Sequence, residues 1–65
     1  MNAVGTPPNI KQRQLLRIAQ VKEKLAEKYA RLAKTVSSKV TRRIYLNRVK
    51  KYTLQAKNAR ILAGQ

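Results

Sequence analysis

The chain has 65 residues, no cysteine, histidine, tryptophan or phenylalanine, and 16 Lys and Arg against 2 Asp and Glu, for a net charge of +14. A chain of this length forms one domain at most, and its small core needs additional support. The lack of cysteine and histidine excludes disulfides and the usual zinc sites. Because concentrated positive charge opposes folding, the composition predicts an anionic partner, with nucleic acid the strongest candidate.

The N-terminal stretch MNAVGTPPN carries no charged side chain. Its glycine and two consecutive prolines favour extended or irregular backbone. Asn9 is a residue type that caps helices, and Gln12 stands three residues later, in the capping-box position. The sequence therefore predicts an extended leader over residues 1–9 and a single helical RNA-binding unit over residues 10–65.

Residues 10–35 predict an amphipathic helix. Apolar residues recur there at intervals of three and four, and Ala19, Ala26 and Ala33 recur every seven positions beside them. At about 100° per residue these positions share one side of a helix, where an alanine column lets a second helix approach closely. The apolar positions are Leu15, Ile18, Leu25, Tyr29, Leu32 and Val36.

Residues 39–62 predict a second helix. The segment between the two helices, KTVSSK, is rich in β-branched and serine residues, which weakens helical structure. The apolar residues of the second segment form a stripe of their own. In one continuous helix this stripe would lie roughly 150° around the helix from the stripe of residues 10–35. A bend near Ser37 and Ser38 lets the two stripes face each other. We therefore expect an all-α protein of two helices, as a hairpin or a bent pair. One long helix is the alternative, and it needs a large partner to support it. The second stripe consists of Tyr45, Val49, Tyr52, Ala56, Ala59 and Ala63.

Side chains for enzymatic chemistry are nearly absent. Glu23 and Glu27 are the only acidic side chains, one turn apart on a basic helix, and we expect them to pair with basic residues three or four positions away. No glycine-rich phosphate loop exists, because Gly5 and Gly64 stand near opposite ends. We therefore expect no enzyme, no metal or other cofactor and no small-molecule substrate.

Basic residues form an arc on each predicted helix. On the first helix the arc lies opposite the apolar stripe and contains almost no acid, which favours phosphate contact over a plain solvated surface. On the second helix Leu46, Leu54 and Ile61 lie within or beside the arc. That surface suits phosphates together with apolar or sugar–base edges, although scattered apolar residues without function are the alternative. The tyrosines lie on the inner stripes, which favours a core role over base stacking. The candidate RNA-binding residues are Arg13, Arg17, Lys24, Lys28, Arg31, Lys39, Arg42, Arg43, Arg48, Lys50, Lys51, Lys57 and Arg60.

No signature of a sequence-specific DNA reader or of a known RNA-binding module is present. As a class, the chain resembles the small helical ribosomal proteins, which are short, rich in lysine and arginine, and poor in cysteine and tryptophan. This resemblance is one of general character and spans the chain. It implies a structural role in which two helices lie between rRNA segments and screen their repulsion, and in which the leader enters a crevice. It also implies neighbouring ribosomal proteins as partners and a cytoplasmic or organellar ribosome as the location.

Three other classes stay open at this point. One is a nucleoid or genome-packaging protein that condenses duplex DNA, and another is a regulatory protein that covers an acidic surface. The third is a membrane-active cationic peptide, which the charge on both arcs and the lack of Trp and Phe oppose. We expect no transmembrane segment and no secretory signal, because long apolar runs are missing. Residues 10–35 are basic and amphipathic like a transit peptide, but their glutamates and lack of serine oppose that role.

Overall fold

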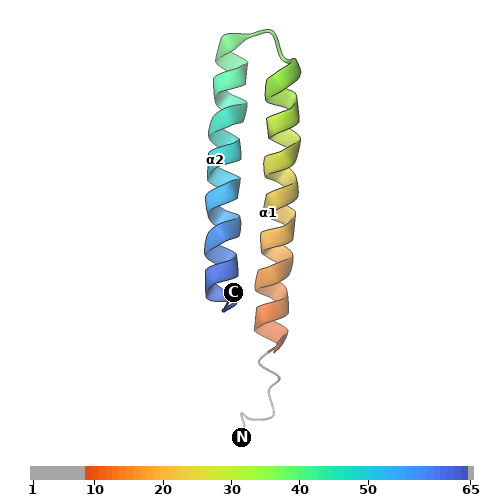
Figure 1. The fold of residues 1–65 in the computed structure, drawn as a ribbon, viewed down its shortest axis with the longest axis vertical. Helices are drawn as coiled ribbons and strands as arrows, with labels where there is room; N and C mark the ends of the chain where they lie inside the picture. The colour runs from red at the N-terminus through yellow and green to blue at the C-terminus, as the bar shows by residue number, and fades with distance from the viewer. Residues whose placement is uncertain (1–8, 65) are drawn as a thin grey trace, which may run out of the picture.

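The computed structural model describes residues 9–64 and shows two antiparallel α-helices joined by a short turn (Figure 1). Helix α1 spans Asn9–Thr35 and helix α2 spans Lys39–Leu62. The predicted all-α pair of helices is confirmed, in its hairpin form, and the single continuous helix is wrong. Asn9 already belongs to α1, so this helix begins one residue before the predicted boundary. The remainder of the predicted leader lies outside the described residues.

The turn lies where the sequence predicted a bend. Ser38 has an extended backbone, and its Oγ accepts a hydrogen bond of 3.3 Å from the backbone N–H of Thr41, which caps the start of α2. Arg42 reaches back across the turn and donates to the carbonyls of Ala33 at 3.2 Å and Val36 at 2.9 Å. Carbonyls at the end of a helix lack partners within it and carry partial negative charge. Arg42 therefore caps the end of α1 from the first turn of α2.

The open end of the hairpin is also tied. Gln12 Nε2 donates to the carbonyl of Ala63 at 3.0 Å, which links the first turns of α1 to the end of α2. Gly64 has a φ of 88°, in the left-handed region that glycine adopts without strain. Its N–H donates to the carbonyl of Ile61 at 3.0 Å. Gly64 thus lies just past the end of the second helix, while the side chain of Gln12, which stands in the predicted capping-box position, bonds across the helices instead.

The two helices meet along a column of alanines that we call the alanine seam. Every buried residue in the described part of the chain is an alanine, and no large side chain there is fully buried. A methyl group adds little bulk, so the two backbones approach closely, as the seven-residue alanine spacing predicted. The seam consists of Ala19, Ala26, Ala33, Ala56, Ala59 and Ala63.

Larger residues line the seam and are only half-buried. The ring of Tyr29 lies 5.6 Å from that of Tyr45 and 5.8 Å from that of Tyr52, centroid to centroid, so the tyrosines pack on one another between the helices. Ile18 was predicted to face inward, but it is 46% exposed. That prediction is wrong because the contact line follows the alanines, which leaves Ile18 beside it. The half-buried aliphatic residues of the predicted inner stripes are Leu15, Leu25, Leu32, Val36 and Val49.

Candidate nucleic-acid interface

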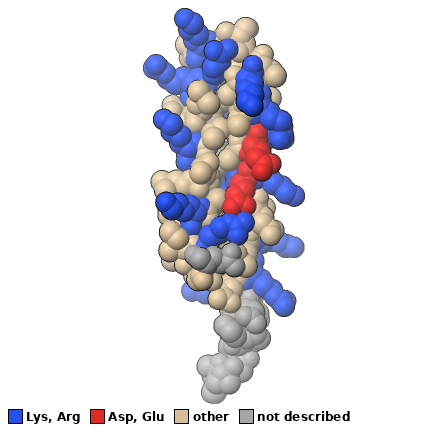
Figure 2. Space-filling model, viewed as in Figure 1, with Lys and Arg blue, Asp and Glu red and all other residues tan. Residues whose placement is uncertain are grey.

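Lysine and arginine side chains project from both long edges of the hairpin (Figure 2). The outward side of α1, which we call the α1 outer face, carries only polar and basic residues along its centre. Arg13 and Arg31 mark its ends, roughly 27 Å apart along the helix at about 1.5 Å per residue. All five predicted cations of this face are exposed, and they are Arg13, Arg17, Lys24, Lys28 and Arg31.

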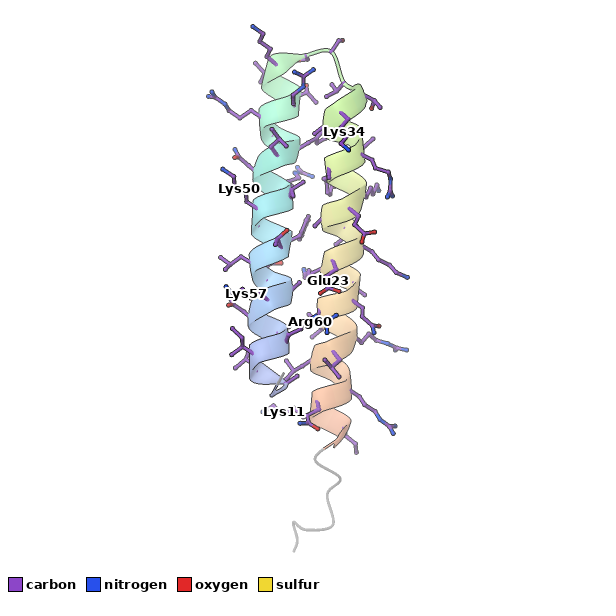
Figure 3. The ribbon with its side chains drawn as sticks, in the orientation of Figure 1. Lys11, Glu23, Lys34, Lys50, Lys57 and Arg60 are labelled. Atoms are coloured by element: carbon purple, nitrogen blue, oxygen red, sulfur yellow. The ribbon has the colours of Figure 1, made fainter. Side chains whose placement is uncertain are left out.

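The outward side of α2, the α2 outer face, mixes cations with aliphatic side chains. Its members follow one another at steps of three and four residues, so they lie on one line along the helix. Leu46, Leu54 and Ile61 are 45%, 57% and 58% exposed, as the sequence predicted for this arc. Figure 3 shows Lys50 and Lys57 pointing away from α1. The α2 outer face comprises Lys39, Arg43, Leu46, Lys50, Leu54, Lys57 and Ile61.

A surface hollow lies on α2 at the turn end of this face. It has a volume of 460 Å³, and Lys39, Arg43 and Lys50 lie around it together with the side chain of Leu46. A comparable hollow of 490 Å³ on α1 lies between Arg13 and Arg17. Each helix therefore offers a place where a phosphate group would meet two or three cations at once.

Three of the predicted RNA-binding arginines hold the hairpin together. Arg42 caps α1, as described above. Arg48 donates from Nη1 to the hydroxyl of Tyr29 at 3.1 Å, and its guanidinium carbon lies 5.3 Å from the centre of that ring. Arg60 donates to both carboxylate oxygens of Glu23, from Nε at 2.7 Å and from Nη2 at 2.8 Å. The contacts of Arg48 and Arg60 join residues 19 and 37 positions apart, and those of Arg42 cross the turn. The spacing of the basic residues gave no signal of any of them.

Lysines surround the tyrosine cluster. The ammonium groups of Lys22 and Lys51 lie 5.2 Å and 5.9 Å from the ring centre of Tyr52, and that of Lys28 lies 5.9 Å from the ring centre of Tyr29. The face of an aromatic ring is negative and attracts a cation, with an energy of about 0.5–1 kcal/mol at an exposed site. Lys22 interrupts the apolar stripe of α1, and this contact explains how the stripe accommodates a charge.

The two acidic side chains lie on one flank of the hairpin. Glu23 and Glu27 form the acidic patch along α1 that faces the viewer in Figure 2. Figure 3 shows Glu23 and Arg60 pointing toward each other from α1 and α2. The hydrogen bonds and the charge of Arg60 lower the pKa of Glu23 below its ordinary value of 4.5, and Glu23 raises the pKa of Arg60. The partner of Glu23 therefore lies across the seam, which corrects the expectation of a basic neighbour on the same helix.

Two other kinds of functional feature are a metal centre and a membrane-spanning helix. Within residues 9–64 no three side chains of His, Cys, Asp or Glu gather where they could hold a metal ion. In the same range neither helix combines the length and the hydropathy that crossing a membrane requires. The described residues form a slender, charged hairpin about 40 Å long, the length of the 27 residues of α1 at about 1.5 Å per residue.

Comparison with known proteins finds no matching family model, no matching curated protein and no matching solved structure. Neither the resemblance to ribosomal proteins nor any of the alternative classes gains support from these comparisons. The function has to be inferred from the charge and the shape of the hairpin.

Proposed function

We propose that this protein is a structural RNA-binding protein, a small ribosomal or ribosome-associated protein, whose helices pack against RNA phosphates. One observation carries the proposal: nine exposed cations lie on the two outer faces, five on α1 and four on α2, with almost no negative charge among them. A row of cations at helical spacing neutralises phosphates and releases the counterions condensed on the polynucleotide. This release supplies the binding energy without reading the base sequence.

The shape of the hairpin supports a position between RNA segments. The two outer faces point away from each other across the slender pair of helices (Figure 1), so one straight strand cannot contact both. Two neighbouring segments of a folded RNA can, and the hairpin then screens the repulsion between them. In this role the protein works as part of a ribosome, in the cytoplasm or in an organelle.

The mixed α2 outer face favours folded RNA over regular duplex DNA. Folded RNA presents unstacked bases, sugars and 2′-hydroxyls beside its phosphates, which gives Leu46, Leu54 and Ile61 apolar surface to cover. The outside of a DNA duplex offers mainly phosphates. A DNA-condensing protein is the second candidate, because two opposed basic faces also bridge two duplexes.

Competition binding separates the candidates. The protein is bound to a labelled fragment of structured rRNA at fixed salt, and unlabelled RNA, duplex DNA or anionic lipid vesicles are added as competitors. We expect the RNA to displace the label at the lowest concentration per phosphate. Displacement by duplex DNA at equal or lower concentration would favour the condensing protein. Displacement by vesicles alone would favour the membrane-active peptide.

Sedimentation tests the ribosomal assignment. The protein is mixed with purified ribosomal subunits and centrifuged through a sucrose gradient at low and at high salt. We expect it to travel with the subunits at low salt and to stay at the top of the gradient at high salt. Protein that stays at the top under both conditions would remove the ribosomal part of the proposal.

A further inference from the structure

An apolar stripe on α1 is left uncovered by α2. Ile18 and Val21 are 46% and 51% exposed, and Leu25 and Leu32 are half-buried. These residues follow one another at steps of three, four and seven, so they lie on one line along the helix. The line runs beside the alanine seam, and we call it the apolar flank.

This line of apolar residues and the carboxylates of Glu23 and Glu27 lie on opposite sides of the hairpin. Leu25 and Glu27 stand on either side of the seam residue Ala26, because successive residues of a helix are about 100° apart. The salt bridge to Arg60 places the carboxylates of α1 on one flank. The contact between Tyr29 and Arg48 marks the other flank, since Tyr29 lies one turn after Leu25.

Cations border the apolar flank. Lys28 stands between Leu25 and Leu32 at helical spacing, and Arg48 and Lys51 approach from α2 with their side chains against the tyrosines. The described residues contain no acidic side chain besides Glu23 and Glu27, which lie on the opposite flank. A partner that covers the apolar flank therefore meets aliphatic groups at the centre and only positive charge at the edges.

We propose that the apolar flank docks an amphipathic helix of a partner protein, with an apolar stripe and acidic residues along both of its edges. A third helix at this place buries Ile18 and Val21 and gives the hairpin the bulky core that the alanine seam does not supply. The acidic edges pair with Lys28, Arg48 and Lys51. This inference does not rest on RNA binding.

Two other occupants fit the flank poorly. A second copy of the chain carries the same charge of +14 and has no acidic edge to present, because its two glutamates lie on its opposite flank. Folded RNA presents its apolar surface in patches beside phosphates, which matches the interrupted α2 outer face better than a contiguous aliphatic stripe. On the α2 outer face, by contrast, Leu46 and Leu54 each stand between two cations and Ile61 follows Lys57, so no continuous apolar surface forms there.

A synthetic peptide tests the proposal. The probe is a helical peptide with leucine at the a and d positions of each heptad, glutamate at e and g, and one tryptophan. Its fluorescence reports binding, because the protein has no tryptophan. We expect one peptide to bind per protein. A second peptide has the same glutamates but glutamine in place of leucine, and its affinity should be lower by about tenfold or more. Equal binding of the two peptides would overturn the proposal.

Matched variants locate the site. Ile18→Gln with Val21→Gln should weaken peptide binding about tenfold or more, since covering two half-exposed aliphatic groups removes about one side chain's apolar surface from water. Leu54→Gln with Ile61→Gln changes two somewhat more exposed aliphatic residues on the α2 outer face and should leave binding within about twofold. Equal losses for both pairs would contradict the proposal. Both pairs are exposed, and circular dichroism checks that the variants stay helical.

Two further measurements distinguish a partner helix from the two other occupants of the apolar flank, RNA and a second copy of the chain. If the Ile18 and Val21 variant lost affinity for the rRNA fragment as strongly as for the peptide, the flank would belong to the RNA. If the unaltered protein dimerised in sedimentation equilibrium and this variant did not, the flank would belong to a second copy. We expect neither change, so RNA affinity and monomeric state should match the unaltered protein.

Discussion

Helices α1 and α2 are alike on the side that they share and different on the side that each turns outward. Helix α1 contributes three buried alanines to the seam, and α2 contributes two, with Ala63 just past its end as the sixth. The α1 outer face is polar and basic along its centre, whereas the α2 outer face alternates lysine and arginine with leucine and isoleucine. The shared side closes the hairpin, and in the proposed function the two outer sides contact the RNA. A purely basic face suits phosphates, and a mixed face suits phosphates that lie next to apolar surface.

The largest effect should come from the side that the helices share. Ala19 and Ala56 are 0% and 1% exposed, so a leucine at either place forces the backbones apart, at a cost of about 1–3 kcal/mol. A hairpin with so small a core has little stability to lose. We expect Ala19→Leu and Ala56→Leu each to reduce the helical circular dichroism signal strongly. Gln20→Leu, at an exposed position of α1, is the control. Unchanged helicity in both seam variants would show that the seam is not the contact that closes the hairpin.

Charge reversal on either outer face should have the next largest effect. Arg17→Glu with Arg31→Glu changes α1, and Arg43→Glu with Lys50→Glu changes α2. We expect each pair to lower RNA affinity about tenfold or more for all RNA sequences alike, and to reduce the salt slope by about two. Filter binding measures both quantities. The charge-conserving pair Arg17→Lys with Arg31→Lys should bind like the unaltered protein. A face whose reversal leaves affinity unchanged does not contact the RNA.

A smaller effect on RNA affinity should come from the apolar side chains, and it should differ between the two outer faces. Leu54→Gln with Ile61→Gln removes apolar surface from α2 without changing charge, and we expect RNA affinity to fall a few-fold while the salt slope stays the same. The same filter-binding titration measures this. Adding apolar surface to α1 with Gln20→Leu should not raise affinity. If it did, or if the α2 pair had no effect, the mixed composition of the α2 outer face would have no role in binding RNA.

The smallest effect concerns the ion pair between Glu23 and Arg60. Because the folded hairpin lowers the pKa of Glu23 below 4.5, the pair stabilises the hairpin above that pH, and the stabilisation is lost as the pH falls through the lowered pKa. Both side chains are more than one third exposed, so solvent screening keeps the effect small.

A pH titration of helicity tests this ion pair. We expect a slight loss as the pH is lowered from neutral to about 3. Glu23→Gln should abolish the pH-dependent loss, while Glu27→Gln, one turn further along the same flank, should retain it. If Glu23→Gln titrated like the unaltered protein, the salt bridge would not contribute to stability in solution.

Local pattern predicted most of the fold. Three-and-four spacing with the seven-residue alanine repeat predicted both helices and their contact, and Ser38 and Gly64 mark ends that residue type alone indicates. Ile18 was misplaced because α1 is apolar over a wide arc. Within that arc the smallest side chains, not the largest, determine where the second helix lies, and hydrophobicity alone does not distinguish them.

The candidate site was predictable only in part. Exposure of the basic arcs follows from their place opposite the apolar stripes, so helical spacing was sufficient. The contacts of Arg42, Arg48 and Arg60 were not predictable, because each depends on a residue brought close by the hairpin turn. A count of basic residues does not distinguish an arginine that caps a helix from one that faces solvent.

The salt dependence of RNA binding tests the central claim most directly. Equilibrium constants for a structured rRNA fragment, and for a second RNA of unrelated sequence, are measured between 50 and 200 mM salt. With six to nine outer-face cations on phosphates, we predict a log–log slope of about −4 to −8, the same for both RNAs. An affinity that stays constant over this range of salt would contradict the account. So would binding to only one of the two RNAs.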